Sequence, residues 1–175
     1  MDEIIITEYN PNWVLLFAQE AVSIRAVLDA GLITRIEHFG STAVPGLAAK
    51  PIIDLLVGIR SLAEVKQVAV PQLERLGYAY WLDNPDPERM FFVKGLPPNG
   101  PRTHHLHMVE PDSVLWERLL FRDYLRKHAD EAAHYAQLKY HLAQRFFSDR
   151  EAYTTGKAEY IESVMQKAWQ PPANP

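Results

Sequence analysis

The sequence of 175 residues contains no cysteine, so disulfide bonds and thiol catalysis are both excluded. A zinc ion would have to be held by nitrogen and oxygen ligands alone. No apolar run approaches the roughly 18 residues that a membrane-spanning helix needs, and the start Met1-Asp2-Glu3 lacks the basic segment of a secretory signal. We therefore expect a cytoplasmic protein with no membrane partner.

An excess of basic residues is also absent. There are 18 Lys and Arg against 22 Asp and Glu, which gives a formal net charge of -4 and a pI near 6.0. Proteins that bind nucleic acids without sequence preference usually carry a strong basic balance, so general nucleic-acid binding is not expected. With 47% hydrophobic and 23% charged residues, the composition is typical of a globular protein with a proper core.

A glycine-serine turn between two apolar runs is the strongest functional clue in the chain. The runs read as strands, and Gly40-Ser41 begins the loop that joins them. Gly40 lets the backbone approach a ligand closely, Ser41 adds a hydroxyl donor, and Lys50 adds a mobile positive charge. Asp54 follows in the second run, so the loop and a carboxylate are predicted to face one cleft that binds phosphate. An ordinary surface loop is the alternative.

Histidines cluster in a later strand-like run, Thr103-His104-His105-Leu106-His107. Strand alternation places His105 and His107 on one face and His104 on the other. With Asp54 on a neighbouring strand, His105 and His107 would form a catalytic and metal-binding set suited to zinc, iron or manganese. Without metal they can bind phosphate, or one can act as a general base. Alternatively, they lie on a polar sheet face and Asp54 is a structural carboxylate that caps the loop.

Apolar periodicity predicts the other elements, with a short edge strand at residues 4–6 and a hairpin joining 78–81 to 90–94. Helices are expected at about 13–30, 62–76, 130–147 and 153–169, with another after Asp112. The expected fold class is α/β (α+β), a small mixed sheet of four or five strands flanked by helices. We expect a sheet domain at 1–111 and a helical C-terminal portion at 112–170, packed as effectively one domain, 1–170.

Cationic and aromatic residues in the second half are further candidates for phosphate or nucleotide binding. They comprise Arg102 in a loop and two pairs spaced four residues apart on predicted helices: Tyr135 with Lys139, and Tyr153 with Lys157. Tyrosine can stack on a base, and lysine can offset phosphate charge. The alternatives are a polar turn at Arg102, a polar helix flank with partly buried tyrosines and a solvated basic face formed by Arg118, Arg122 and Arg126.

The motifs Gly40-Ser41-Thr42-Ala43-Val44-Pro45-Gly46-Leu47, Lys50-Pro51, Ile53-Asp54 and Thr103–His107 together resemble the GrpB family, and the resemblance covers nearly the whole chain. Members are small bacterial proteins, found alone or fused to dephospho-CoA kinase or acetyltransferases. The family is similar to minimal nucleotidyltransferases of the DNA polymerase β type, which implies a nucleotidyltransferase-like fold and nucleotide-related chemistry with a nucleoside triphosphate and a divalent metal (Mg, Mn or Zn).

One residue departs from the nucleotidyltransferase pattern. In that pattern, two carboxylates two residues apart on a strand point to the same face and hold magnesium ions. Here Asp54 is followed two positions later by Leu56, which cannot bind a metal. Two-metal transfer would need replacement ligands from another strand, so the resemblance leaves catalysis open.

Three hypotheses follow. The first is a nucleotide- or phosphate-ligand protein that resembles a minimal nucleotidyltransferase and carries out metal-dependent transfer. The second is a non-catalytic accessory or chaperone-like module that binds a nucleotide, a coenzyme A precursor or a partner enzyme such as dephospho-CoA kinase. The third, a purely structural association through the helical half, would leave the loop, Asp54 and the histidines without a shared purpose.

Overall fold

The computed structural model describes residues 3–96 and 100–169. Its sheet contains β1 (Ile33–Phe39), β2 (Ile53–Ile59), β3 (Tyr78–Tyr80), β4 (Arg89–Lys94) and β5 (His104–Val109), in the order β1-β2-β5-β4-β3. The pair β2-β5 is parallel, whereas the other three pairs are antiparallel. The predicted small mixed sheet and the α+β fold class are therefore confirmed, and so is the predicted hairpin between β3 and β4.

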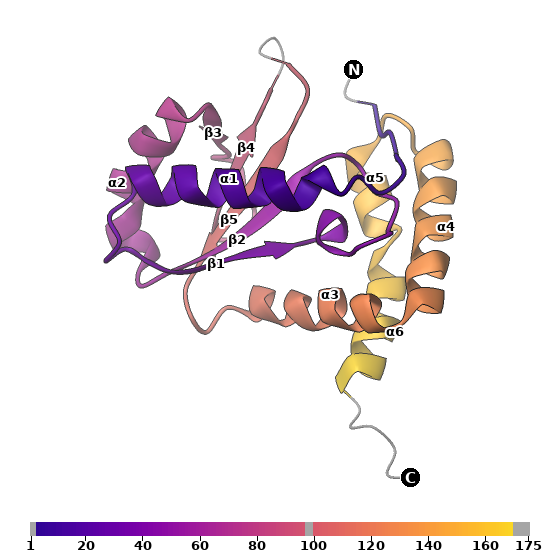
Figure 1. Ribbon diagram of the computed structural model, residues 1–175. Coiled ribbons are helices and arrows are strands. Elements are labelled where there is room, and N and C mark those ends of the chain that lie inside the picture. The colour runs from indigo at the N-terminus through magenta and orange to yellow at the C-terminus, as the bar shows by residue number, and fades with distance from the viewer. Residues whose placement is uncertain (1–2, 97–99, 170–175) are drawn as a thin grey trace.

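The helices are α1 (Asn12–Val27), α2 (Leu62–Arg75), α3 (Arg118–Lys127), α4 (Ala129–Arg145), α5 (Arg150–Thr155) and α6 (Ala158–Trp169), with short 3-10 turns η1 (Ser41–Ala43) and η2 (Val114–Glu117). Figure 1 shows α1 and α2 against one face of the sheet, α3 alongside β1, and α4 to α6 gathered beyond the end of the sheet. No helix in the two described ranges is both long and apolar enough to cross a bilayer.

Side-chain alternation on β2 explains how the sheet separates its core from its functional face. Ile53, Leu55 and Val57 are buried in the main core under α1 and α2. Asp54 and Leu56 point to the opposite face, as alternation requires. There Leu56 packs with η2 and α3 in a small separate cluster, while Asp54 lies at the open end of the strand.

The loop after β1 packs against the C-terminal helices. Val44 and Leu47 share a buried cluster with Leu125 of α3, Tyr135 of α4 and Val164 of α6. The predicted division of the chain at residue 111 stays a prediction, and residue 170 lies outside the described range. What the packing establishes is that the turn at the end of β1 is enclosed by helices from the last third of the chain.

Three predicted elements need correction. Residues 4–6 form no strand; instead Thr7 pairs with Ala49 in an isolated bridge, and the amide of Ile4 donates to the Phe147 carbonyl. The first helix ends at Val27 because Leu28 is already extended. The last predicted helix is divided at Gly156 into α5 and α6, at a point where a Cβ would lie 2.7 Å from Leu142 of α4.

Candidate functional site

A cavity of about 370 Å³ opens where the exposed end of the sheet meets α4 and α5. Its lining includes every candidate site residue except Arg102: Gly40, Ser41, Lys50, Asp54, His105, His107, Tyr135, Lys139, Tyr153 and Lys157. Phe39, Phe91 and Thr154 also line it, although they were not among the predicted site residues. Nothing in their local pattern distinguishes them from ordinary core or helix residues.

The glycine-serine turn is built around Asp54. Gly40 has a φ of 72° and a ψ of -173°, a backbone conformation open almost only to glycine. A Cβ on Gly40 would lie 2.4 Å from Oδ2 of Asp54, far inside contact distance. The absence of a side chain therefore lets the turn lie directly on the carboxylate, and Ser41 begins η1 at the edge of the cavity.

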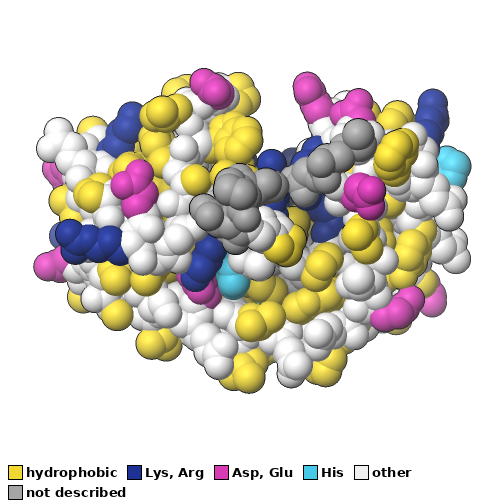
Figure 2. Space-filling model, turned by 90° about the horizontal axis from the view of Figure 1, so that it is seen from above, with side chains coloured by type: hydrophobic (Ala, Val, Ile, Leu, Met, Phe, Trp, Pro, Cys, Tyr) yellow, Lys and Arg dark blue, Asp and Glu magenta, His cyan; other side chains and the backbone are white. Residues whose placement is uncertain are grey.

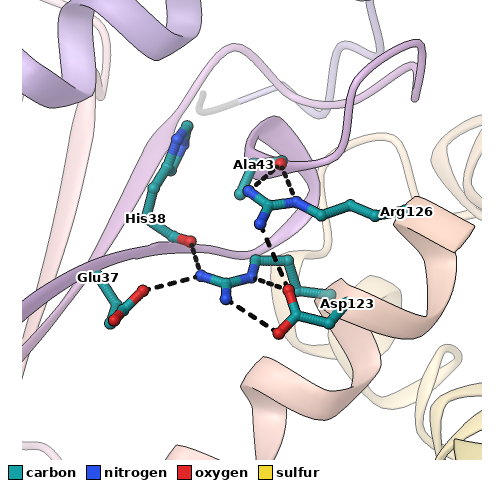
Figure 3. A network of polar contacts seen from close by, with 6 residues as sticks. Glu37, His38, Ala43, Asp123 and Arg126 are labelled. Carbon is teal, nitrogen blue, oxygen red and sulfur yellow. Dashed lines mark hydrogen bonds and ion pairs between the residues drawn. The ribbon is translucent and has the colours of Figure 1, made fainter.

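Two arginines of α3 hold the turn from outside, as Figure 3 shows. Arg126 donates two hydrogen bonds to the carbonyl of Ala43, at 3.0 and 2.8 Å. Arg122 donates to the carbonyl of His38 at 2.8 Å and to the Glu37 carboxylate at 3.0 Å. The solvated basic face considered for these residues is thus wrong for Arg122, which is buried and paired.

Because Asp123 accepts hydrogen bonds from both arginines, α3 acts as a clamp on the turn. We expect Arg126→Gln to lower the free energy of unfolding by about 1 kcal/mol, since it loses charge-assisted bonds at a partly exposed site. Arg126→Lys should lower the free energy of unfolding by less, because the lysine ammonium group can still donate to the Ala43 carbonyl. Urea unfolding measures both, with the exposed Lys127→Gln as control. Equal losses for Gln and Lys at position 126 would contradict the clamp.

Asp54 and His105 face each other across the parallel pair β2-β5, where they are in register. His105 Nδ1 lies 3.1 Å from Oδ1 of Asp54. Burial opposes ionisation of Asp54, but the hydrogen bond from His105 and nearby positive charge outweigh it and lower the pKa of the carboxyl group. Asp54 is therefore the acceptor of this bond, and His105 carries its proton on Nδ1.

His107 has a different hydrogen-bond partner. Its Nδ1 lies 3.3 Å from Nη1 of Arg89, which can only donate, so this nitrogen is the acceptor. Burial lowers the pKa of His107 to about 3, and the charge of Arg89 also lowers it. A neutral imidazole is therefore held beside the ring of Phe91, at 4.7 Å between centroids.

A metal centre was predicted at Asp54, His105 and His107. Within residues 3–96 and 100–169, no three His, Asp or Glu side chains are grouped so that they could hold a metal ion. The contact of His107 with a guanidinium also disfavours a cation there, because like charges repel. The metal set of Asp54, His105 and His107 stays a prediction.

His38 supports the turn from beneath, on the α1 side of β1. Its ring stacks on Phe17 at 4.7 Å, and Nε2 lies 3.0 Å from the hydroxyl of Thr42. That hydroxyl donates its proton to the Ile52 carbonyl, so His38 is the donor to Thr42. Burial, with Arg126 and Arg122 adding to it and Asp54 opposing it, lowers the pKa of His38 to about 4.

This buried histidine predicts acid sensitivity. The unfolded chain binds a proton at His38 near pH 6.5, whereas the folded chain does so only near pH 4. The free energy of unfolding should therefore fall as the pH drops from 6.5 to 4, by roughly 2–3 kcal/mol from this group. Urea unfolding at pH 7 and 4.5 tests it. His38→Gln should reduce the dependence by about this amount, leaving the part that comes from the buried His107, whereas His134→Gln on the exposed face of α4 should leave the dependence unchanged. Parallel curves for both variants would contradict the assignment.

Three lysines converge on the cavity. Burial, followed by the charges of Lys157 and Lys50, lowers the pKa of Lys139 to about 7. Burial and neighbouring cations also lower the pKa of Lys50 to about 8. The pKa of Lys157 falls to about 8 by burial, although Asp54 opposes the change. Among the described residues that line this cavity, Asp54 is the single carboxylate, so positive charge is in excess.

The two tyrosines position these lysines. Lys50 and Lys157 lie over the ring of Tyr153, at 4.9 and 4.5 Å from its centroid. Lys139 lies 4.7 Å from the centroid of Tyr135 and donates to the carbonyl of Ala48. Both rings are buried, so their contact with a base stays a prediction, and what they do in this structure is to orient ammonium groups.

The comparisons with known proteins agree with this architecture. The family model described as GrpB protein matches residues 3–167. A UPF0157 protein of Pseudomonas aeruginosa is 49% identical over 169 residues, covering 95% of this chain and 68% of that protein. The crystal structure of the conserved protein GrpB from Enterococcus faecalis has a TM-score of 0.83 and 36% identity, covering 94% of this chain and 96% of that one.

Two more distant similarities concern larger proteins. The Cid1 poly(U) polymerase has a TM-score of 0.55 and 14% identity, covering 80% of this chain and 45% of that one, a likeness of fold alone. A dephospho-CoA kinase of Mycolicibacterium paratuberculosis is 26% identical over 192 residues, covering 91% of this chain and 44% of the kinase. Because the GrpB model matches nearly the whole sequence, this chain belongs to the GrpB protein family, with a nucleotidyltransferase-like fold.

Proposed function

We propose that this protein binds a phosphorylated small molecule, a nucleotide in the first instance, in the cavity between the sheet and α4–α5. The observation that carries the proposal is the convergence of Lys50, Lys139 and Lys157 on a cavity with one carboxylate. Burial of these ammonium groups disfavours their charged form and lowers their pKa values, and the charges of neighbouring lysines add to this at Lys50 and Lys139. A bound phosphate would supply the missing negative charge and raise those pKa values again.

The turn beside the lysines supports a phosphate rather than a carboxylate ligand. Gly40 leaves room for close approach of backbone and ligand, and the Ser41 side chain, hydrogen-bonded to Tyr135, lies at the same wall. A phosphate group has several charged oxygens and can contact more than one ammonium group at once. Nucleotides are favoured within this class because the chain shares its fold with the Cid1 poly(U) polymerase, whose structure was solved with MgGTP bound.

Transfer chemistry is a further step of the proposal. Asp54 and His105 form a hydrogen-bonded pair in the cavity, whereas Leu56 fills the position of a second carboxylate. A divalent ion, if one binds, would have Asp54 and His105 as its protein ligands and would offset the charge of the phosphate oxygens. Asp54→Asn would then abolish turnover of a nucleoside triphosphate while leaving phosphate binding by the lysines in place.

Thermal unfolding with and without ligand tests the binding proposal. Pyrophosphate, ATP, GTP, CTP, UTP and dephospho-CoA should each be tried with and without magnesium, manganese or zinc, because a ligand of the native state raises its stability. Lys157→Gln should weaken the binding of the effective ligand about tenfold or more. Lys66→Gln is the matched control, since Lys66 also lies over a tyrosine ring but belongs to α2 and does not line the cavity. No stabilisation by any of these ligands would refute the proposal.

A second candidate rests on the similarity to a dephospho-CoA kinase. In that version the cavity binds a coenzyme A precursor and the protein performs no chemistry, serving instead as an accessory module for the kinase. Leu56 is consistent with it, because the carboxylate pair for metal-dependent transfer is incomplete. Stabilisation by dephospho-CoA, without turnover of any triphosphate and with binding to the kinase, would favour this candidate over an enzyme.

A further inference from the structure

A cavity of about 790 Å³, the α6 groove, lies between η2, α6 and the turn that leads into β4. Figure 1 shows α6 beside α3, whose first residue, Arg118, also lines the groove. The volume falls within the roughly 300–1,000 Å³ typical of small-molecule sites. The groove and the first cavity share no lining residue among the described parts of the chain, so they are distinct.

The α6 groove begins next to the first cavity. Lys157 lines the first cavity, and Ala158, the next residue in the chain, lines the groove. Arg89 lines the groove, and its Nη1 lies 3.3 Å from Nδ1 of His107 in the first cavity. Besides burial, the charge of Arg118 lowers the pKa of Lys157, so these two side chains are close. A ligand whose phosphate contacts Lys157 is therefore near enough to extend into the groove.

One face of α6 forms a long wall of the groove. At helical spacing this face presents five lining residues, which are Ala158, Glu162, Met165, Gln166 and Trp169. At a rise of 1.5 Å per residue, the wall is roughly 16 Å long from the first of these residues to the last. A ligand that fills the groove from the end beside Lys157 must therefore be elongated, and a nucleoside is too short to span it.

The groove also carries exposed apolar side chains. Trp169 is 60% exposed, and Val114 of η2 is 72% exposed. Among residues 3–96 and 100–169, no ring or cation is stacked on Trp169. Trp81, the other exposed tryptophan, lies under the guanidinium of Arg102, which was predicted to bind phosphate but lines neither cavity. Trp169 and Val114 therefore offer an apolar surface that a ligand can cover.

The polar side chains of the groove suit amide groups better than phosphate. Glu117 and Glu162 accept hydrogen bonds, Arg118 donates them, and both functions are combined in Gln166. The described lining holds three carboxylates and two guanidinium groups, so the groove lacks the excess of positive charge found in the first cavity. Figure 2 shows Lys and Arg side chains gathered in a hollow near the middle of another part of the surface. A chain of amides, which needs both donors and acceptors, matches the groove.

We propose that the α6 groove binds an extended amide-bearing arm, the pantetheine arm of a coenzyme A precursor, while the phosphate to which the arm is attached lies in the first cavity. The proposal rests on the proposed function for the phosphate end and names the ligand class: a phosphate ester with a long arm, as opposed to a plain nucleotide. Pantetheine combines amides, a hydroxyl and apolar groups in one flexible chain, which matches the mixed lining and the length of the wall. The similarity to a dephospho-CoA kinase is consistent with such a ligand.

Calorimetric titration of the full chain with dephospho-CoA and with ADP tests this proposal. Both compounds contain adenosine and a diphosphate, and they differ by the pantetheine arm. ADP carries more negative charge, so tighter binding of dephospho-CoA comes from the arm and not from the phosphates. We expect dephospho-CoA to bind at least tenfold more tightly than ADP, because the arm buries apolar surface against Trp169 and Val114.

Trp169→Ala should remove most of this gain, while the affinity for ADP stays within about twofold of the unsubstituted protein, because separate groups bind the two ends of the ligand. Trp169→Phe, which keeps an aromatic ring, should retain most of the gain. Phe147→Ala is the matched control, since Phe147 is 57% exposed but lines neither cavity. Thermal unfolding without ligand checks that the variants fold.

Equal affinities for dephospho-CoA and ADP, or a gain that survives Trp169→Ala, overturn the arm site and leave the proposed function intact. Failure of dephospho-CoA, ADP and pyrophosphate to bind refutes the proposed function and the arm site together. A gain that is lost in Trp169→Ala and kept in Trp169→Phe and Phe147→Ala supports the arm site.

Discussion

Gly40→Ala is expected to lower the free energy of unfolding by about 2–4 kcal/mol and to abolish phosphate binding at the same time. Two costs combine at this position. The φ of 72° with a ψ of -173° is strained for any residue with a side chain, and the new Cβ would lie 2.4 Å from Oδ2 of Asp54. The turn must therefore move away from Asp54, which also displaces Ser41 from the cavity wall.

Gly46→Ala is the matched control for this prediction. Gly46 lies in the same loop and has a φ of 78°, but a Cβ built there meets no atom within 4 Å among the described residues. Gly46→Ala should therefore show the conformational cost alone, about 1–2 kcal/mol, and should keep most of its affinity for phosphate. Urea unfolding and calorimetric titration with pyrophosphate measure both effects. Equal effects of the two substitutions would show that contact with Asp54 is unimportant.

Sequence reasoning could reach the loop, Asp54 and the histidines because their signals are local. Gly40-Ser41 punctuates two apolar runs, and alternation fixes which residues of a strand share a face. Asp54 and His105 then lie opposite each other because β2 and β5 are parallel neighbours in the sheet. The sequence pattern alone does not establish that the two strands are neighbours. The fold class and the β3-β4 hairpin could be predicted for the same reason, because short-range patterns in the sequence specify them.

The rest of the site depends on how distant helices pack, and no local pattern encodes that. Arg122 and Arg126 have the spacing of an exposed basic face, yet they reach carbonyl groups some 80 residues earlier in the chain. Arg150 had no motif, yet it lines a cavity together with Lys50, which lies 100 residues earlier in the chain. The strand predicted at residues 4–6 is absent because the amide of Ile4 donates to the carbonyl of Phe147, just after α4, a contact set by tertiary packing.

The protein without ligand is expected to become more stable as the pH rises from 7 to 9.5. A lysine in the unfolded chain has a pKa near 10.5, whereas the folded values are about 7 for Lys139 and about 8 for Lys50 and Lys157. Between these limits the unfolded chain binds more protons, so the free energy of unfolding increases with pH. Allowing for screening of the partly exposed groups, the gain should be roughly 2–4 kcal/mol, measurable by urea unfolding.

The same titration has the opposite consequence for the bound state, and this contrast separates a ligand site from a merely crowded cluster of lysines. Phosphate is held by the charged ammonium groups, so stabilisation by pyrophosphate should be largest near pH 7 and largely lost by pH 9.5. Lys157→Met should weaken the pH dependence of the free energy of unfolding and that of the stabilisation by pyrophosphate, because it removes one titrating group from each. Lys66→Met should change neither dependence. Measurements must stop below pH 10. Above it the unfolded chain loses tyrosine protons that the buried Tyr135 and Tyr153 keep, because burial raises their pKa values, so the free energy of unfolding would fall with pH. If stability rises with pH while stabilisation by pyrophosphate does not fall, the anion is bound elsewhere and the lysines serve only the fold.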